Sequence, residues 1–195
     1  MIIHFTAKHI SPQHASFIAR WVQLNPNDQI KVYSDEANLE LIRTHYPQFL
    51  KDYNNFQHHI ERVDFVRYAY LHHFGGAYSD IDVEPYRPIA NLVSEVPTFP
   101  IEPIPNGFGN QFLIGNYFMM APQGSDMMLE AMTRAAQPFI YTGNKRIDVL
   151  KRTGCVMLTK LAQDYHCGLL PSDYFTPTKT SDQPYGRHHF ASTWW

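Results

Sequence analysis

Apolar and polar positions along the first half of the chain predict strands and helices in turn. Residues 2–6 (IIHFT) form a short apolar run typical of a buried strand, and residues 29–34 alternate as a second strand would. Between them, Ser11 precedes a proline, which is a favourable helix start, and Asn25 precedes another, which favours a stop. The pattern therefore predicts a strand, a helix and a strand in that order.

A helix capped by Asp35 is expected next, and the longest helical pattern then runs from about Gln57 to Phe74. Gly75-Gly76 is a natural C-terminal stop for that helix. A strand through Tyr78 should follow and break at Glu84-Pro85. This segment predicts a helix leading directly into a central strand.

The second half is less regular. Residues 116–121 (NYFMMA) predict a further buried strand, and Ser125 caps a helix that runs up to Pro138. From Leu169 onward the chain is rich in Pro, Tyr, Thr and His, and we expect it to fold back over one edge of the sheet. The alternation of strands and helices predicts a single α/β layered domain over residues 1–195.

Composition narrows the class of protein. Hydrophobic residues make up 44% of the 195 residues and charged residues 17%, as in ordinary globular proteins. The net charge of −2 gives no basic field for nucleic acid. No apolar run approaches a membrane span and the N-terminal residues lack a signal-peptide pattern, so we expect a soluble cytoplasmic protein. The two cysteines lack the spacing of a zinc site, and free thiols are the simplest expectation, although one disulfide between them stays open.

Two carboxylates at the end of the strand through Tyr78 are the first candidates for chemistry. Asp80 and Asp82 are spaced i and i+2, so a strand end or turn can direct both toward one cation. Hard oxygen ligands suit Mg²⁺ or Mn²⁺, and such a metal can neutralise charge on a departing diphosphate. Two acids near a turn are more often a solvated surface pair, so the spacing needs support from elsewhere.

Support comes from the preceding helix and from the C-terminal residues. Asp64, Arg67 and Tyr68 fall on one face of the helix, where an ordinary ion pair is the alternative to a site that binds sugar or phosphate oxygens. His188-His189, Ser192 and Trp194-Trp195 form a concentration of His and Trp near the end of the chain. These residue types can bind a metal or stack on a base, and a tail anchored by Trp is the alternative.

One histidine of the opening strand is a further candidate. His4 would lie near the carboxyl end of that strand, where open α/β sheets bind ligands. A histidine satisfied within the core is the alternative. The segment from Glu102 to Tyr117 has Gly, Asn and aromatic residues suited to an acceptor or donor-sugar pocket, and a plain Gly/Pro loop is equally open.

Taken together, these motifs resemble the DxD sugar-transferase family, glycosyltransferase family 32. That family includes the yeast initiating α-1,6-mannosyltransferase and bacterial capsule enzymes, and it is distantly similar to the large clostridial toxin glucosyltransferases. The resemblance begins with Ile2 to Phe5 and ends with the C-terminal motif. Its core is Asp64-x-x-Arg67-Tyr68 followed by Gly75-Gly76-x-Tyr78-x-Asp80-x-Asp82, with Asn116, Thr153-Gly154 and His188-His189-x-x-Ser192-x-Trp194 in order.

The resemblance implies a GT-A-like nucleotide-sugar-binding domain with a mixed central sheet flanked by helices. It also implies retention of configuration, a nucleotide-sugar donor, a glycan or other hydroxyl acceptor, and a role in polysaccharide synthesis. Asp80 and Asp82 would hold Mn²⁺ (or Mg²⁺) together with His189 and Ser192, and Arg67 would act with the two acids in catalysis. The implied donor-binding residues are His4, Phe5, Asp64, Arg67, Tyr68, Tyr78, Asp80, Asn116 and Trp194.

Two departures from the family pattern concern the donor. The first strand of the family continues into a Trp that can stack on the base, and this chain has Ala7. The usual Thr-Gly-Pro reads Thr153-Gly154-Cys155. Two other classes compete with the transferase: a metal-dependent phosphohydrolase, which would need further carboxylates for a second metal, and a non-catalytic binder of sugars or nucleotides.

Overall fold

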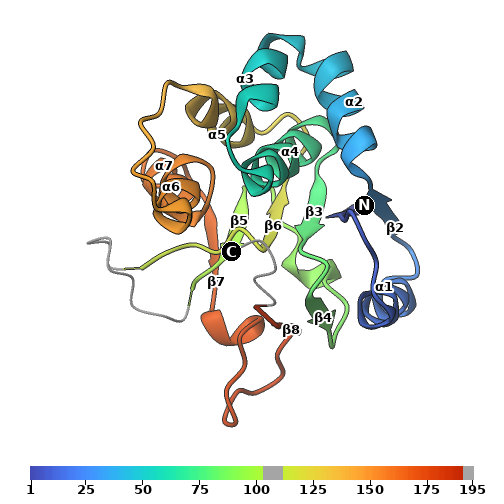
Figure 1. Ribbon diagram of the computed structural model, residues 1–195. Helices are drawn as coiled ribbons and strands as arrows, with labels where there is room; N and C mark the ends of the chain where they lie inside the picture. The colour runs from blue at the N-terminus through green and yellow to red at the C-terminus, as the bar shows by residue number, and fades with distance from the viewer. Residues whose placement is uncertain (103–111, 191–195) are drawn as a thin grey trace.

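A mixed six-stranded sheet forms the centre of the computed structural model, which describes residues 1–102 and 112–190 (Figure 1). The strand order is β2-β1-β3-β6-β5-β7, and β4 and β8 form a separate two-stranded sheet. The strands are β1 (Ile2–Thr6), β2 (Gln29–Tyr33), β3 (Gly76–Ser79), β4 (Val83–Pro85), β5 (Thr98–Pro100), β6 (Phe118–Ala121), β7 (Gly168–Leu170) and β8 (Gly186–His188).

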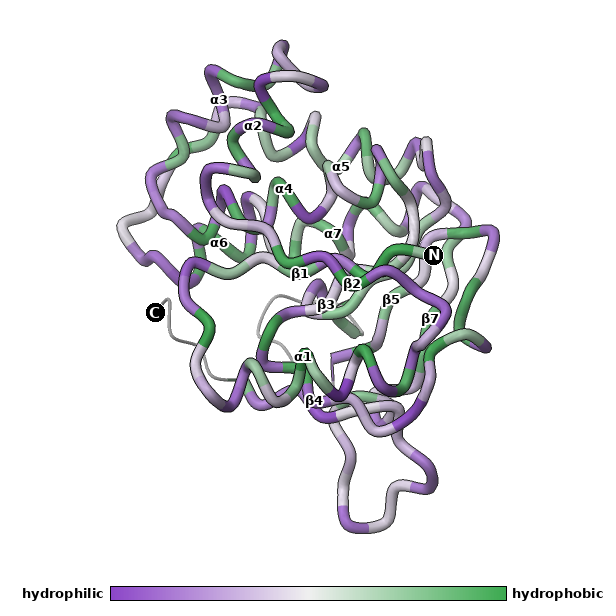
Figure 2. Tube along the Cα trace, turned by 90° about the vertical axis from the view of Figure 1, so that its right-hand side faces the viewer, coloured by the Kyte–Doolittle hydropathy of each residue, from purple (hydrophilic) through white to green (hydrophobic). Residues whose placement is uncertain are grey.

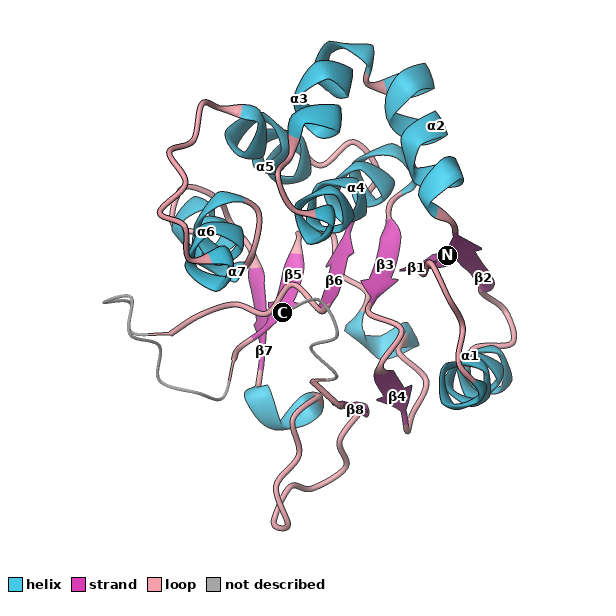
Figure 3. Ribbon diagram, viewed as in Figure 1, coloured by secondary structure: helices cyan, strands magenta, loops and turns pink. Residues whose placement is uncertain are grey.

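Seven α-helices are found among the described residues, and six of them, α2 to α7, gather on one side of the molecule (Figure 3). The helices are α1 (Pro12–Leu24), α2 (Asp35–His45), α3 (Leu50–Asn55), α4 (His59–Phe74), α5 (Asp126–Ala136), α6 (Lys145–Arg152) and α7 (Cys155–Leu161). Short 3-10 helices are η1 (Pro47–Phe49), η2 (Ala90–Leu92) and η3 (Ser172–Tyr174).

Side chains of the central strands alternate between two hydrophobic cores, as the pleat of a strand requires. Tyr78 and Met119 pack into the core shared with α2, α4, α5 and α7. Ala77 and Phe118 point to the other face, where Trp21 of α1 packs. Figure 2 shows that the long loop between η3 and β8 is polar to neutral. The sheet is therefore covered on both faces.

Strand directions confirm the expected mixed sheet flanked by helices. β1 pairs in parallel with both β2 and β3. β6 then pairs antiparallel with β3 and with β5, and β5 pairs in parallel with the edge strand β7. The central strand β3 therefore lies between β1 and β6, and whatever follows β3 emerges in the middle of the sheet.

Most element predictions hold, and three need correction. Ser34 rather than Asp35 caps α2, because its hydroxyl accepts a hydrogen bond from the N–H of Ala37. Glu84-Pro85 does not break the structure but lies within β4, which pairs with β8. The strand expected from residue 116 begins at Phe118.

Two glycines make the turn from α4 into β3. Gly75 ends the helix with a φ of 66° and Gly76 begins the strand with a φ of 95°. A Cβ on Gly75 would lie 2.6 Å from the backbone N of Gln123, and one on Gly76 would collide with the carbonyl oxygen of Ile2. The predicted stop at this pair is confirmed, and glycine is needed because both the backbone angle and the close approach exclude a side chain.

The C-terminal segment folds back as expected. β7 forms the edge of the main sheet and β8 pairs antiparallel with β4. Both cysteines are free thiols. None of the helices in the described part of the chain is long and apolar enough to cross a membrane.

Candidate active site

Asp80 directly follows the central strand β3 and is held by backbone and side-chain contacts. Its N–H donates to the carbonyl oxygen of Tyr117 at 2.7 Å, and its Oδ1 accepts from the hydroxyl of Tyr78 at 3.0 Å. The same Oδ1 lies 3.3 Å from the guanidinium of Arg67. The side chain keeps 28% of its surface exposed, so this carboxylate is fixed and still accessible.

Asp82 and His188 complete a cluster that could hold a metal ion. Asp82 precedes β4, and His188 lies in β8, the strand that pairs with β4. Oδ1 of Asp82 is 3.5 Å from Nε2 of His188, and both side chains are largely buried. Asp80, Asp82 and His188 each offer one ligand atom, and these atoms all lie within 4.8 Å of one another. Two carboxylates and an imidazole are a donor set that fits a divalent cation.

Arg67 of α4 is a buried cation that links the acids. Its NH2 lies 3.2 Å from Asp64 and 3.3 Å from Asp80, and its NH1 donates to the carbonyl oxygen of Asn116 at 2.7 Å. The guanidinium also lies 4.8 Å from the ring centre of Tyr78. Its Nε is buried without a hydrogen-bond partner among the described residues. This set of contacts fixes a positive charge directly beside Asp80.

Asp64 is buried and its oxygens are occupied by protein donors. Oδ1 accepts from the amide of Asn116 at 3.0 Å and Oδ2 from the hydroxyl of Thr153 at 2.8 Å, in addition to the ion pair with Arg67. Tyr68, four positions after Asp64 on α4, donates its hydroxyl to the carbonyl oxygen of Thr153 at 2.6 Å. The arrangement makes Asp64 a support for Arg67.

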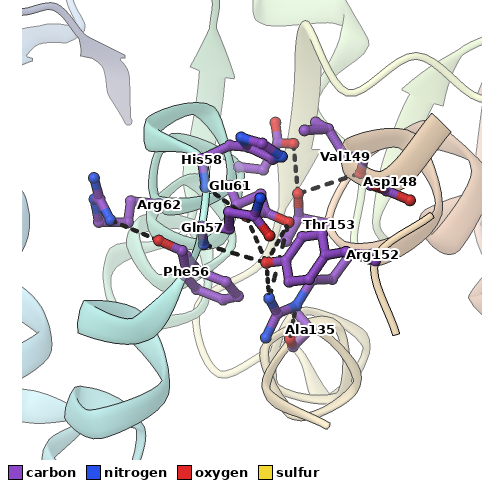
Figure 4. A network of polar contacts seen from close by, with 12 residues as sticks. Phe56, Gln57, His58, Glu61, Arg62, Ala135, Asp148, Val149, Arg152 and Thr153 are labelled. Atoms are coloured by element: carbon purple, nitrogen blue, oxygen red, sulfur yellow. Dashed lines mark hydrogen bonds and ion pairs between the residues drawn. The ribbon is translucent and has the colours of Figure 1, made fainter. Parts of the chain in front are cut away.

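The polar stripe on α4 extends toward the start of the helix. Glu61 is one helical turn before Asp64 and is fully buried. It accepts from the N–H of His58 and from the hydroxyl of Tyr141, both at 2.9 Å, and it lies 3.9 Å from Arg152 at the end of α6 (Figure 4). Thr153 follows Arg152, so the end of α6 contacts α4 at both Glu61 and Asp64. These contacts help to set the position of Asp64.

Burial acts on the ionisation of both acids beside Arg67. It raises the pKa of Asp64 to about 6, and the charge of Arg67 and the Thr153 hydrogen bond oppose that shift. Burial also raises the pKa of Asp80, again opposed by Arg67. A cation bound at Asp80 and Asp82 would favour the ionised form of both carboxylates.

The structure brings together most, but not all, of the residues expected at the site. Asp64, Arg67, Tyr68, Tyr78, Asp80, Asp82 and Asn116 lie in one connected cluster. His4 instead hydrogen-bonds to the carbonyl oxygen of Gly75 and to Tyr33, and Phe5 packs against Trp21. Both are fully buried in the cores. Ser192 and Trp194 lie outside the described residues.

The expected metal ligand His189 needs correction. His189 lies 3.1 Å from Glu84 and stacks on Phe17, whereas the neighbouring His188 faces Asp82. Successive residues of a strand point to opposite sides, so only one of two adjacent histidines in and after β8 can face the acids. The structure therefore groups His188, rather than His189, with the two acids.

Sequence reasoning missed two further groups near the acids. Tyr117 stacks on His188 with ring centres 4.2 Å apart, and its buried hydroxyl has no hydrogen-bond partner among the described residues. Glu102 follows β5, and the charges of His188 and Asp80 both act on its carboxyl group. The only signal was the segment from Glu102 to Tyr117, which pointed to a pocket without singling out either residue.

Comparisons with known proteins agree with this geometry. The structure is similar to that of the PaToxG glycosyltransferase, with a TM-score of 0.60 over 84% of this chain and 68% of that one. The sequence identity is 15%, so this likeness concerns the fold alone.

Curated relatives match part of the chain. Inositol phosphoceramide mannosyltransferase 3 of Schizosaccharomyces pombe is 34% identical over 51% of this chain and 28% of its own length. Mannosyl phosphorylinositol ceramide synthase CSH1 of Saccharomyces cerevisiae is 32% identical over 57% of this chain and 30% of its own length. The chain thus spans less than a third of these relatives.

A family model covers the segment that contains the acids and Arg67. Residues 11–99 match the model described as a glycosyltransferase sugar-binding region containing a DXD motif. In that range, Asp80 and Asp82 are the only pair with the DXD spacing. The resemblance expected from the sequence is therefore confirmed over residues 11–99, which match a glycosyltransferase sugar-binding region and carry the DXD spacing at Asp80 and Asp82.

Proposed function

We propose that this protein is a metal-dependent, retaining glycosyltransferase that moves a hexose from a nucleoside-diphosphate sugar to a hydroxyl acceptor. The observation that carries the proposal is the cluster of Asp80, Asp82 and His188, with ligand atoms within 4.8 Å of one another, directly beside the buried Arg67. A divalent cation and a fixed guanidinium are the two kinds of group that bind a diphosphate and stabilise its departure.

Mn²⁺ fits the donor set better than Mg²⁺. Mg²⁺ prefers oxygen ligands alone, whereas a set of two carboxylates and one imidazole includes a softer nitrogen. Asp80, Asp82 and His188 would hold the ion, and the ion would supply charge neutralisation at the leaving diphosphate. Ser192 remains a proposed additional ligand.

The residues of the chain have separate tasks in this proposal. Arg67 faces the oxygens of the donor with its charge kept in place by Asp64, and Tyr78 fixes the carboxylate of Asp80 through a 3.0 Å hydrogen bond. Because these groups are oriented before the donor binds, they stabilise developing charge without reorganising. Retention of configuration rests on the family resemblance, and front-face attack assisted by the leaving phosphate is the mechanism we propose.

The relatives' names suggest mannose as the first sugar to test. Two of them are named as a mannosyltransferase and a mannosyl phosphorylinositol ceramide synthase. We therefore propose GDP-mannose as the leading donor, with UDP-sugars as the alternatives. For the acceptor we propose a glycan or other molecule that presents a hydroxyl group.

The test is release of nucleoside diphosphate from donor alone. The purified protein is incubated with GDP-mannose, UDP-glucose, UDP-galactose or UDP-N-acetylglucosamine, with Mn²⁺ or with EDTA. We expect release from one donor that EDTA abolishes and that Asp82→Asn lowers by about a hundredfold, the order of loss when a main charge stabiliser is removed. Silence from every donor, together with no Mn²⁺-dependent nucleotide binding by calorimetry, would refute the proposal.

Two adjacent histidines provide a matched pair of variants. His188→Ala should weaken Mn²⁺ binding about tenfold or more, because it removes a ligand, whereas His189→Ala should change it by less than about twofold. Equal effects of the two variants would show that His188 is not a ligand. Release of phosphate from simple phosphomonoesters would instead favour the phosphohydrolase, although among the described residues only one group of three or more potential metal ligands occurs.

A further inference from the structure

Glu102 follows β5, and backbone hydrogen bonds hold its main chain in place. Its N–H donates to the carbonyl oxygen of Leu113 at 2.8 Å, and Ile101 just before it pairs with Ile114 in an isolated antiparallel bridge. The N–H of Gly115 donates to the carbonyl oxygen of Pro100 at 2.7 Å. Glu102 therefore extends β5 and has a fixed backbone, as a residue that positions a ligand requires.

The side chain of Glu102 lies beside that of Tyr117. A Cβ placed on Gly115 would lie 3.2 Å from Oε1 of Glu102 and would also collide with the ring of Tyr117. The absence of a side chain at Gly115 thus leaves room for the carboxylate and the ring to approach each other. The ring of Tyr117 in turn stacks on His188 at 4.2 Å, so Glu102 is connected to the acid cluster through one aromatic residue.

Two polar atoms in this corner have no hydrogen-bond partner in the described part of the chain. The hydroxyl of Tyr117 and Nδ1 of His188 are both buried without a hydrogen bond to any described residue. Tyr117 is only 2% exposed, so leaving its hydroxyl unpaired costs free energy. Buried polar groups in proteins are almost always hydrogen-bonded, and such an atom at the edge of a site indicates a polar ligand.

Glu102 is not part of the metal cluster. Asp80, Asp82 and His188 form the group with mutually close ligand atoms, and Glu102 does not belong to it. Burial raises the pKa of the Glu102 carboxyl group, and the charge of Asp80 adds to that shift while His188 opposes it. A carboxylate that faces a sugar-nucleotide site without binding the metal is suited to accept hydrogen bonds from hydroxyl groups.

We propose that Glu102 and Tyr117 form a subsite that binds a sugar hydroxyl, with the Glu102 carboxylate as acceptor and the Tyr117 hydroxyl as its neighbouring polar partner. The hydroxyl belongs either to the transferred hexose or to the acceptor. This subsite rests on the proposed transferase function and adds a residue that discriminates between substrates. A hydroxyl lost or inverted at this position would leave the Glu102 carboxylate unpaired, which is how polar sites reject close analogues.

The test compares Glu102→Gln with Glu95→Gln, which alters an exposed glutamate before β5. Both variants are assayed for Mn²⁺ binding, for binding of nucleoside diphosphate and of intact nucleotide sugar, for donor hydrolysis and for transfer. Glu102→Gln should bind Mn²⁺ and nucleoside diphosphate within about twofold of the wild type and lose about tenfold to a hundredfold in sugar turnover. Tyr117→Phe, which removes only the hydroxyl, should lose a smaller part of the same activity.

The steps affected identify the source of the hydroxyl. Weaker binding and slower hydrolysis of the nucleotide sugar assign it to the donor, whereas a loss confined to transfer, with a raised KM for the acceptor, assigns it to the acceptor. Full activity of Glu102→Gln, equal to that of Glu95→Gln, overturns the subsite, and so does a tenfold loss of Mn²⁺ affinity, which would make Glu102 a ligand. A wild-type protein that cleaves no donor refutes the transferase function itself, and the subsite with it.

Discussion

His4 should make the stability of this protein depend on pH in a measurable way. The imidazole is fully buried in the middle of β1, where Nε2 donates to the carbonyl oxygen of Gly75 at 2.9 Å and Nδ1 accepts from the hydroxyl of Tyr33 at 3.1 Å. Its ring also stacks on Tyr70. Burial lowers the pKa of His4 from 6.5 to about 4, and the hydrogen bond to Gly75 opposes this only in part.

The sign and size of the effect follow from that pKa. The unfolded chain takes up a proton at His4 near pH 6.5, whereas the folded protein does so only near pH 4. The contribution of His4 to stability is therefore complete above pH 6.5 and is lost as the pH falls toward 4. When the pH falls from about 7.5 to about 5, His4 alone should lower the free energy of unfolding by about 2 kcal/mol, because each pKa unit corresponds to about 1.4 kcal/mol.

Urea unfolding across that pH range measures the effect. His4→Gln keeps a neutral polar side chain but cannot take up a proton, so it should be less stable than the wild type at about pH 7.5 through lost stacking. The difference in unfolding free energy between the wild type and His4→Gln should then narrow by about 2 kcal/mol when the pH is lowered to about 5. His9→Gln replaces an exposed histidine and should follow the wild type throughout. Parallel curves for the wild type and His4→Gln would refute the reasoning.

Two further predictions concern the central turn and the support of the site. Gly76→Ala should destabilise the folded protein by about 2 kcal/mol or more in thermal unfolding, because both its φ of 95° and the carbonyl oxygen of Ile2 oppose a side chain. Gly143→Ala is the control for the backbone angle alone, because Gly143 has a φ of 84° and nothing lies within 4 Å of its added Cβ. Equal losses of stability in the two variants would contradict the steric argument. Thr153→Val should lower the rate of donor hydrolysis about tenfold, because it removes the hydrogen bond to Asp64. Thr153→Ser keeps the hydroxyl and should restore the rate. An unchanged rate in Thr153→Val would contradict the role of Thr153 in positioning Asp64.

Much of the fold could be predicted because its signals are local. The apolar run of β1, the proline after Ser11 and the glycines after Phe74 each determine an element from neighbouring residues. β4 escaped prediction because three residues that include a proline carry no strand signal. It exists because β8, about a hundred residues later, supplies its partner. Such pairing between distant segments is decided by tertiary contacts and leaves no periodic pattern.

The site shows the same division between local and distant information. Asp64, Arg67, Asp80 and Asp82 could be grouped because a helix face and a strand end bring them together over a short stretch of chain. The choice between His188 and His189 could not be made from spacing, because it depends on the register of β8 against β4, and a change of one residue turns every side chain to the other face.

Glu102 shows why a carboxylate of this kind stays hidden in the sequence. No motif surrounds it, and it reaches the site only because β5 lies next to β6, whose preceding residues Gly115 and Tyr117 give it room and connect it to His188. Its placement depends on a glycine thirteen positions away as much as on its own side chain. A site built in this way can keep its metal cluster and Arg67 unchanged while the wall formed by Glu102 and Tyr117 is altered. If those two residues bind a hydroxyl, substrate choice can then vary separately from the chemistry at the diphosphate.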